Sequence, residues 1–300
     1  MAKSKNTIRL SRQDKIFEII SYLLLTIITL VVLYPLYFVL IASISDPTMV
    51  GNGQVIIFPK NIMWDGYQKI FSYQQIWTGY RNTIVYTVLA TVFNVLLTMI
   101  TAYPLSRKDL KGKKLILFYM MFTMYFGGGL IPTFLVIKSL GLYNNWLIMI
   151  FSGLISVSNV IICRTFIMSS IPEDLYEAAM LDGADHFRYF RSVVLPLSTP
   201  VLAVMALYYG VGHWNGYWTA MIYLTDTDLY PLQLVLRGIL TLNQIDTELV
   251  IDFDDAVRQQ RMAELMKYGL IVVSSAPLII IYPFLQKYFA KGVMIGSVKG

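Results

Sequence analysis

The sequence predicts an all-α membrane protein with six transmembrane helices. Hydrophobic residues make up 56% of the 300 residues, charged residues only 14%, and the mean hydropathy is +0.60. One soluble core cannot hold that much apolar surface, so the bilayer must act as the solvent for much of the chain. Apolar runs such as Leu23-Leu24-Leu25-Thr26-Ile27-Ile28 also lack the alternation expected of transmembrane β-strands.

Six apolar runs reach the length of about 20 residues that crosses the hydrocarbon layer. They lie near 19–44, 82–105, 115–137, 146–168, 197–224 and 268–286, and Arg164 is the only charged residue inside them. The first run is too long for the apolar region of a signal peptide, so we expect an uncleaved first helix. The predicted organisation is an N-terminal segment 1–18, a six-helix membrane domain 19–286 and a C-terminal tail 287–300.

Lysine and arginine gather at one side of the predicted spans, which sets the orientation. The amino-terminal segment carries Lys3, Lys5, Arg9, Arg12 and Lys15, the loop after the second run carries Arg107, Lys108, Lys111, Lys113 and Lys114, and the tail carries Lys287, Lys291 and Lys299. We therefore expect both termini in the cytosol. The net charge of +6 follows from this topology rather than from nucleic-acid binding.

Two long loops then face the outside, 45–78 and 225–264. The first has turn signals at Asp46-Pro47 and Gly51-Asn52-Gly53. The second is rich in acids, and we expect its apolar patch 232–242 at a surface because Arg237 interrupts it. Its Asp252-x-Asp254-Asp255 cluster leaves a calcium site open as an alternative to solvated charge, although the glycine and distal glutamate of an EF-hand are missing.

The loop 169–196, between the fourth and fifth runs, is a polar insert with helix signals. Ser170 and Glu173 form a capping-box pattern that predicts a helix start, and Gly183 can supply the left-handed residue that ends the helix. Asp185 can begin a second short helix. On that helix we expect one face to hold Phe187, Phe190 and Val194 and another to hold Arg188 and Arg191.

The spacing within this loop resembles a known family. Glu177-Ala178-Ala179, then Gly183, then Leu195-Pro196 match the signature of the permease subunits of bacterial ATP-binding-cassette (ABC) importers, with Val193 where an isoleucine is usual. The resemblance implies the transmembrane architecture of a type I ABC importer. It also implies that these six residues belong to a coupling helix that contacts a cytosolic ATPase: Glu177, Ala178, Ala179, Gly183, Leu195 and Pro196.

The resemblance covers nearly the whole chain. The ending Gly296-Ser297-Val298-Lys299-Gly300 is similar to that of carbohydrate-type permeases related to the maltose importer. The stretch 125–133, Tyr-Phe-Gly-Gly-Gly-Leu-Ile-Pro-Thr, looks like the LplC/YtcP-like branch, which implies complex and sometimes acidic oligosaccharides as cargo. Its three glycines fit either a watery cavity or close helix packing, and both remain open.

What the sequence lacks also bears on function. It has no Gly-x-x-x-x-Gly-Lys-Ser/Thr phosphate loop, so we expect no ATPase activity and no bound cofactor, with ATP and Mg²⁺ held by a partner. His186 and His213 show no ligand spacing, so we expect no metal site and no catalytic residue. An ion-coupled secondary transporter of a small polar solute is the alternative function, although the six runs contain no Asp or Glu for a proton relay.

The resemblance further implies the partners and the location. These are a second permease in a heterodimer, a cytosolic ATPase dimer and an extracytoplasmic solute-binding protein, assembled in the bacterial cytoplasmic membrane among its lipids. ATPase closure would move the coupling helices and drive alternating access.

Seven residues are candidates for the substrate pathway, because aromatic faces stack on sugar rings and amides bond sugar hydroxyls. They are Asn82, Thr83, Asn159, His213, Trp214, Asn215 and Trp218. For each residue taken singly, the favoured explanation is an interfacial aromatic belt for the tryptophans and interhelical hydrogen bonds for the asparagines. For Arg164 we expect a side chain that reaches toward the cytosolic interface.

Overall fold

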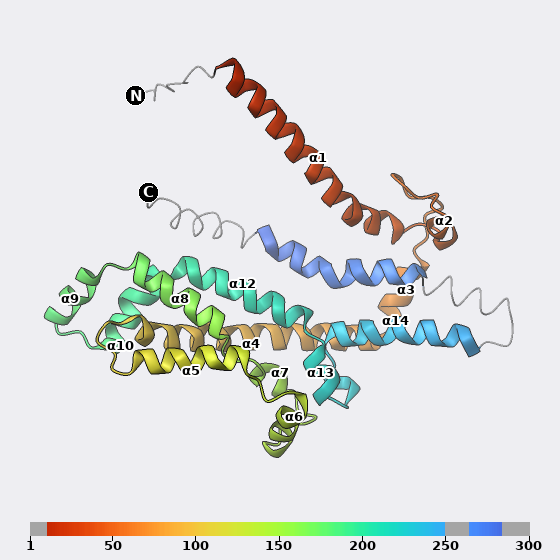
Figure 1. The fold of residues 1–300 in the computed structure, drawn as a ribbon. Helices are drawn as coiled ribbons and strands as arrows, with labels where there is room; N and C mark the ends of the chain where they lie inside the picture. The colour runs from red at the N-terminus through yellow and green to blue at the C-terminus, as the bar shows by residue number, and fades with distance from the viewer. Residues whose placement is uncertain (1–10, 250–263, 284–300) are drawn as a thin grey trace. The chain divides into compact units, whose positions relative to one another are not determined.

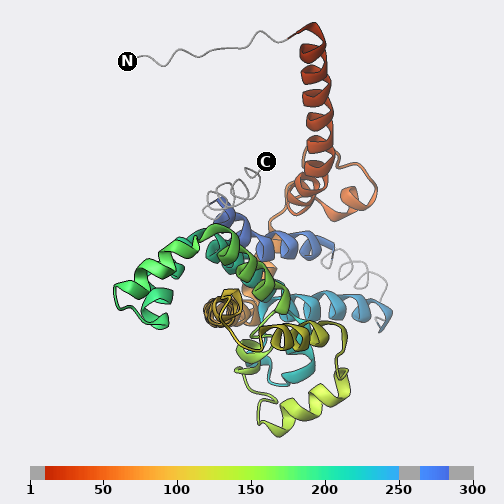
Figure 2. The same cartoon turned by 60° about the vertical axis from the view of Figure 1, so that its left-hand side comes forward.

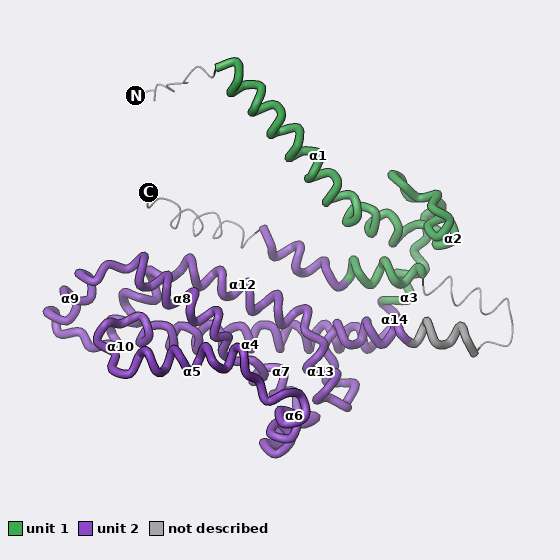
Figure 3. Tube along the Cα trace, in the orientation of Figure 1, with its two compact units in different colours: residues 1–70, 243–273 green, residues 71–242, 274–300 purple. Residues whose placement is uncertain are grey.

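The structure, a computed structural model, describes residues 11–249 and 264–283. Every regular element in those ranges is helical, as the composition predicts (Figure 1, Figure 2). The chain divides into two compact units, Met1–Ile70 with Asn243–Val273 and Phe71–Leu242 with Ser274–Gly300 (Figure 3). The predicted C-terminal tail 287–300 lies outside the described residues.

The first unit is built around one long apolar helix. Its helices are α1 (Arg12–Ala42), α2 (Pro47–Gly51), most of α3 (Asp65–Ser72) and the first half of the helix Glu264–Pro283. α1 begins at a capping box formed by Ser11 and Asp14, and from Ile19 to Tyr37 nearly all its side chains are exposed and most are apolar. Such a surface is costly in water and favourable in lipid, so α1 is suited to a membrane.

The loop predicted at 45–78 has more structure than turn signals alone indicate. Asp46 caps α2 by accepting a hydrogen bond from the Thr48 amide at 2.9 Å, as the Asp-Pro turn predicts. α3 follows, and Gly66 lets it approach Leu265, whose backbone oxygen lies 3.3 Å from where a Cβ would stand. This loop is therefore a folded part of the first unit.

The second unit is organised around α4 (Gln74–Ser106), against which α8 and α12 pack (Figure 1). Its further helices are α5 (Lys113–Tyr125), α6 (Leu130–Ser139), α7 (Ile148–Phe151), α8 (Val157–Ser170), α9 (Glu173–Leu181), α10 (His186–Tyr189), the π-helix η1 (Phe190–Val194), α11 (Leu195–Leu197), α12 (Thr199–Asn215), α13 (Trp218–Tyr223), the 3₁₀ turn η2 (Thr227–Leu229) and α14 (Leu232–Leu249).

α4 buries a stripe of small and polar residues every three or four positions. The stripe consists of Gly79, Thr83, Tyr86, Ala90, Asn94, Thr98 and Ala102. In a membrane, small side chains allow helices to approach closely, and polar side chains bond across the interface. The main core lies here, where Met99, Val160, Cys163 and Met205 pack together from α4, α8 and α12.

The predicted spans match the helices only in part. Among the described residues, α1, α4 and Glu264–Pro283 are each long and apolar enough to cross a membrane. Two bent pairs would bring the number to five: α5 with α6, at 112°, and His186–Leu197 with α12, at 78°. The six predicted runs are therefore not six uninterrupted helices.

The third run bends at its glycines. Gly129 has a φ of +81°, which an L side chain rarely adopts, and it is the residue that precedes α6. Within the described residues, a Cβ at Gly127 or Gly129 would meet no atom within 4 Å. The glycines therefore serve the bend, and they do not mediate close packing within this chain.

The fourth and fifth runs are also interrupted. The run 146–168 is divided into α7 and the 14-residue α8, with Gly153 at φ +72° between them. The run 197–224 is divided at Gly216 into α12 and α13. Mean hydropathy predicted these segments as single helices because it does not register which peptide groups leave the helical pattern.

The described part of the second predicted loop, residues 225–249, is largely helical. α14 occupies Leu232–Leu249, and Leu232, Val235, Leu236 and Ile239 are buried. One face of the apolar patch therefore packs within the second unit, where the expected surface position is wrong, whereas Arg237 on the other face is exposed. The Asp252-x-Asp254-Asp255 cluster lies outside the described residues.

Candidate functional site

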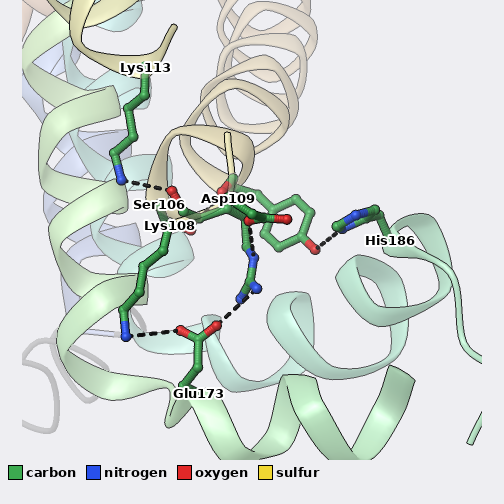
Figure 4. Close-up of polar contacts among 8 residues, drawn as sticks. Ser106, Lys108, Asp109, Lys113, Glu173 and His186 are labelled. Carbon is green, nitrogen blue, oxygen red and sulfur yellow. Dashed lines mark hydrogen bonds and ion pairs between the residues drawn. The ribbon is translucent and has the colours of Figure 1, made fainter. Parts of the chain in front are cut away.

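The 169–196 loop begins with α9, which starts differently from the prediction. Pro172 precedes the helix and offers no side-chain cap, so the expected capping box from Ser170 to Glu173 is wrong. The Glu173 carboxylate instead lies 2.9 Å from Nη2 of Arg107, at the end of α4 (Figure 4). An ion pair with a mostly buried guanidinium has displaced the local capping bond.

The end of α9 is as predicted. Gly183 has a φ of +77°, its N–H donates to the Met180 carbonyl, and the Ala184 N–H donates to the Ala179 carbonyl at 2.9 Å. These two bonds form a Schellman motif, which needs a residue in the left-handed conformation. Asp185 then caps α10 by accepting from the Arg188 amide at 2.7 Å, which confirms the second helix start.

The second half of the loop is wound more widely than expected. Residues Phe190–Val194 form a π-helix, in which each turn holds more residues than an α-helical turn. Val194 is fully buried whereas Phe187, in α10 before the π-helix, is 70% exposed, so the predicted common face is wrong for Phe187. Burial also raises the pKa of the Tyr189 phenol.

The loop presents an exposed apolar and acidic tip. Glu177 and Ala178 are exposed, Leu181 is 89% exposed, and α9 buries none of its residues fully. Two large apolar side chains, Leu181 and Phe187, thus stand on either side of the Gly183 turn. Exposed apolar residues that cluster beside a charge are typical of a surface for another protein.

Most candidates for the substrate pathway tie helices together. The Asn82 amide donates to the Asp228 and Tyr230 carbonyls at 2.7 and 3.1 Å, and the Thr83 hydroxyl accepts from the Leu232 amide at 2.8 Å. These bonds hold the segment between η2 and α14 against α4. Trp214 is 4% exposed and donates to the Ser274 carbonyl at 3.0 Å.

The other candidates are scattered. Asn159 lies in the first turn of α8, where its backbone N–H approaches the Ser156 hydroxyl at 3.5 Å. Asn215 donates to the Val211 carbonyl of its own helix, and Trp218 is 56% exposed. Arg164 does not simply reach toward an interface, because its Nε donates to the Leu105 carbonyl at 2.8 Å.

His213 differs because it borders a cavity at two helix breaks. A cavity of ≈ 290 Å³ lies where the breaks at Gly153 and Gly216 meet, and its lining includes Ser152, Tyr208, His213 and Thr219. Of the seven predicted residues, all of which the structure describes, only His213 lines it. Two helix breaks beside one polar cavity are typical of solute sites in membrane transporters.

Asn94 holds this arrangement and was missed by sequence reasoning. It is fully buried, its amide donates to the Gly153 and Leu154 carbonyls at 2.8 and 2.9 Å, and its Oδ1 lies 3.0 Å from Nε2 of His213. A polar residue in the middle of an apolar run was the available signal. In the described residues, no group of three or more His, Cys, Asp and Glu could hold a metal ion.

Comparisons with known proteins agree on one family. Residues 76–295 match the model of the binding-protein-dependent transport system inner membrane component. Two proteins of Bacillus subtilis (strain 168) are similar over nearly their full lengths. Protein LplC is 34% identical over 98% of this chain and 99% of its own. The polygalacturonan/rhamnogalacturonan transport system permease protein YtcP is 36% identical over 96% of this chain and 100% of its own.

One solved structure is similar in fold and sequence. It is a chain from a bacterial ABC transporter involved in the import of the acidic polysaccharide alginate. The two chains superpose with a TM-score of 0.81 at 34% identity, and the match covers 94% of this chain and 100% of the other. The bent and broken helices described above therefore stand within a known membrane architecture.

Proposed function

The chain belongs to the family of binding-protein-dependent transport system inner membrane components, and on that basis we propose that its 169–196 loop docks on a partner ATPase. As a member of that family, the chain is a multi-pass permease subunit of an ABC importer and not itself an enzyme. Its fold is that of a type I importer permease. The alternative of an ion-coupled secondary transporter is not supported by these relatives.

The exposed tip of the 169–196 loop carries the proposal. Leu181 and Phe187 are 89% and 70% exposed, although burial of either side chain would be favourable by about 1.5–3 kcal/mol. A cytosolic partner with an apolar cleft would gain that free energy, and a basic group there would pair with Glu177. Ala178 leaves room for close approach, and the Gly183 turn sets the angle between α9 and α10.

The proposed assembly supplies what this chain lacks. It consists of this permease, a second permease, an ATPase dimer that holds ATP and Mg²⁺, and an extracytoplasmic binding protein. Both termini and the 169–196 loop face the cytosol, as the lysines and arginines beside the spans require. ATPase closure favours the outward-facing state only if that state binds the closed ATPases more tightly.

We propose an oligosaccharide cargo, with acidic ones included. The support is the similarity to permeases named for polygalacturonan/rhamnogalacturonan and for alginate. Of the predicted pathway residues, His213 is retained, because it borders the cavity at the helix breaks. Asn82, Thr83 and Trp214 are assigned to helix packing instead. Calorimetry of the binding protein against acidic and neutral oligosaccharides tests the cargo class.

Charge reversal at Glu177 tests the docking role. Glu177 is exposed, so Glu177→Lys should leave the fold intact, whereas it should reduce both uptake and transport-linked ATP hydrolysis about tenfold. The measurements are oligosaccharide uptake and ATP turnover by the complete complex in proteoliposomes, together with recovery of the ATPase in a pull-down.

Asp182→Lys is the matched control, because Asp182 is exposed at the end of the same helix and the charge change is identical. We expect it to keep most of the activity. Undiminished uptake in Glu177→Lys, or equal loss in both variants, would refute the specific role of Glu177.

A further inference from the structure

Arg107 connects the end of α4 to the start of α9. Its Nη2 lies 2.9 Å from Oε1 of Glu173, its Nε lies 3.3 Å from Oδ1 of Asp109, and its side chain is only 12% exposed. The guanidinium carbon also stands 3.4 Å from the centre of the Tyr176 ring. One side chain therefore contacts α9 at two positions, at Glu173 (Figure 4) and, three residues further on, at Tyr176.

A second group of contacts joins the same end of α4 to α10. The Tyr103 hydroxyl lies 3.3 Å from Nδ1 of His186 (Figure 4). The Tyr176 ring stacks on the His186 ring, with the ring centroids 5.7 Å apart. The Tyr103 ring also packs against Phe190 at 5.2 Å. Arg107 and Tyr103, one turn apart on α4, together hold both halves of the 169–196 loop.

The backbone segments on either side of α9 are less suited than these side-chain contacts to transmit a displacement of the helix. Before the helix, Ile171 and Pro172 have extended backbones, and after it the chain turns at Gly183. A cavity of ≈ 370 Å³ is lined in part by Ile171 and Pro172. Non-helical junctions beside open space can bend, so movement of α9 reaches the membrane helices mainly through side chains.

α4 can carry such a displacement through the unit. It packs against α8 and α12, and along its length Asn94 bonds the break at Gly153 and Leu154. Through Asn94, α4 also contacts His213 at the cavity. A shift of α4 therefore acts on the backbone that lines the proposed solute cavity.

We propose that Arg107 is a positioning residue that fixes α9 to α4, so that movement of the ATPases is delivered to α4 instead of being absorbed by bending at Ile171–Pro172. The proposal rests on the proposed ATPase docking of the 169–196 loop. An arginine is needed here because its planar guanidinium can pair with a carboxylate and stack on an aromatic ring at the same time. A lysine ammonium cannot make both contacts in this way.

The test separates hydrolysis from transport. In the complete complex in proteoliposomes, Arg107→Ala should still bind the ATPase and hydrolyse ATP, but the uptake per ATP hydrolysed should fall about tenfold. Arg107→Lys should recover only part of that ratio. Lys111→Ala is the matched control, because Lys111 is exposed in the same loop and loses the same charge, and its ratio should equal that of the parent.

A merely structural role would lower the amount of assembled complex without changing the ratio. If Arg107→Ala does not assemble, Glu173→Gln decides, because it removes the ion pair with Arg107 at a partly exposed position, together with only a 3.9 Å contact to the exposed Lys108. An unchanged uptake-to-hydrolysis ratio in the variant that assembles would overturn the proposal while leaving the importer function intact. Failure of the parent complex to couple uptake to ATP would instead overturn the proposed function.

Discussion

Gly183 is the residue on which the shape of the 169–196 loop most directly depends. Its φ of +77° permits the two Schellman bonds that end α9 and direct the chain into α10. A Cβ at this position would meet no atom within 4 Å, so a substitution costs backbone strain and no steric clash.

Gly183→Ala should therefore destabilise the loop by about 1–2 kcal/mol, the usual cost of a left-handed L-residue. We expect weaker recovery of the ATPase in a pull-down and little change in the thermal unfolding of the membrane helices. Gly183→Asn should retain more binding, because asparagine tolerates this conformation. Equal binding by the alanine variant and the parent would contradict a requirement for this turn.

Glu173 shows why single residues can mislead. Its position three residues after Ser170 predicts a capping box, but the carboxylate pairs with Arg107, which is distant in sequence. A carboxylate bonds whichever donor the fold brings near, and an ionised donor forms the stronger bond. The local pattern of Gly183 and Asp185 was reliable because backbone turns depend on neighbouring residues alone.

At the scale of elements, α4 is the helix on which the second unit depends. Its buried stripe of small and polar residues lets α14 approach at Gly79, where a Cβ would stand 3.0 Å from the Leu232 Cα and 3.2 Å from the Leu232 nitrogen. Backbone atoms cannot move aside as a flexible side chain can, so this contact requires glycine.

Gly79→Ala should separate α4 from α14 and destabilise the protein by about 1–3 kcal/mol, the usual cost of overpacking. Thermal unfolding of the purified permease in detergent measures this effect. Gly238→Ala is the matched control: it lies in α14, and among the described residues its Cβ would meet no atom within 4 Å. It should leave the unfolding temperature unchanged or raise it, since alanine favours helices. A stable Gly79→Ala variant would contradict the close approach.

Hydropathy did not predict the breaks between α5 and α6, between α7 and α8, and between α12 and α13. Gly129, Gly153 and Gly216 each mark a break, yet the windows around them remain apolar. Mean hydropathy reports the solvent a segment prefers, not the path of its backbone. Whether a glycine bends a helix or packs in it depends on the bonds that other helices offer, such as those from Asn94 to Gly153 and Leu154.

At the scale of the whole molecule, the permease is one subunit of a transport complex. Its described residues contain no metal-binding group of three or more His, Cys, Asp and Glu, and the proposed energy source is a partner that binds the 169–196 loop.

Proteoliposomes that contain both permeases and the binding protein, but no ATPase, should therefore take up no oligosaccharide under a proton or sodium gradient. Addition of the ATPase and MgATP should restore uptake. The control is the complete complex with a non-hydrolysable ATP analogue, which should permit at most a single turnover. Uptake driven by an ion gradient alone would favour the secondary transporter and contradict the importer.

The sequence by itself determined the helical membrane class, the Gly183 turn, the second helix start at Asp185 and the family. Each of these depends on composition, on neighbouring residues or on a fixed spacing along the chain. Only the tertiary structure decided that Glu173 pairs with Arg107, that Asn82 and Thr83 fasten the start of α14, that one face of α14 is buried from Leu232 to Ile239, and that His213 meets Asn94 beside a cavity. Those contacts join residues far apart in the chain, and a polar group within an apolar segment bonds whichever partner the packed helices bring within reach.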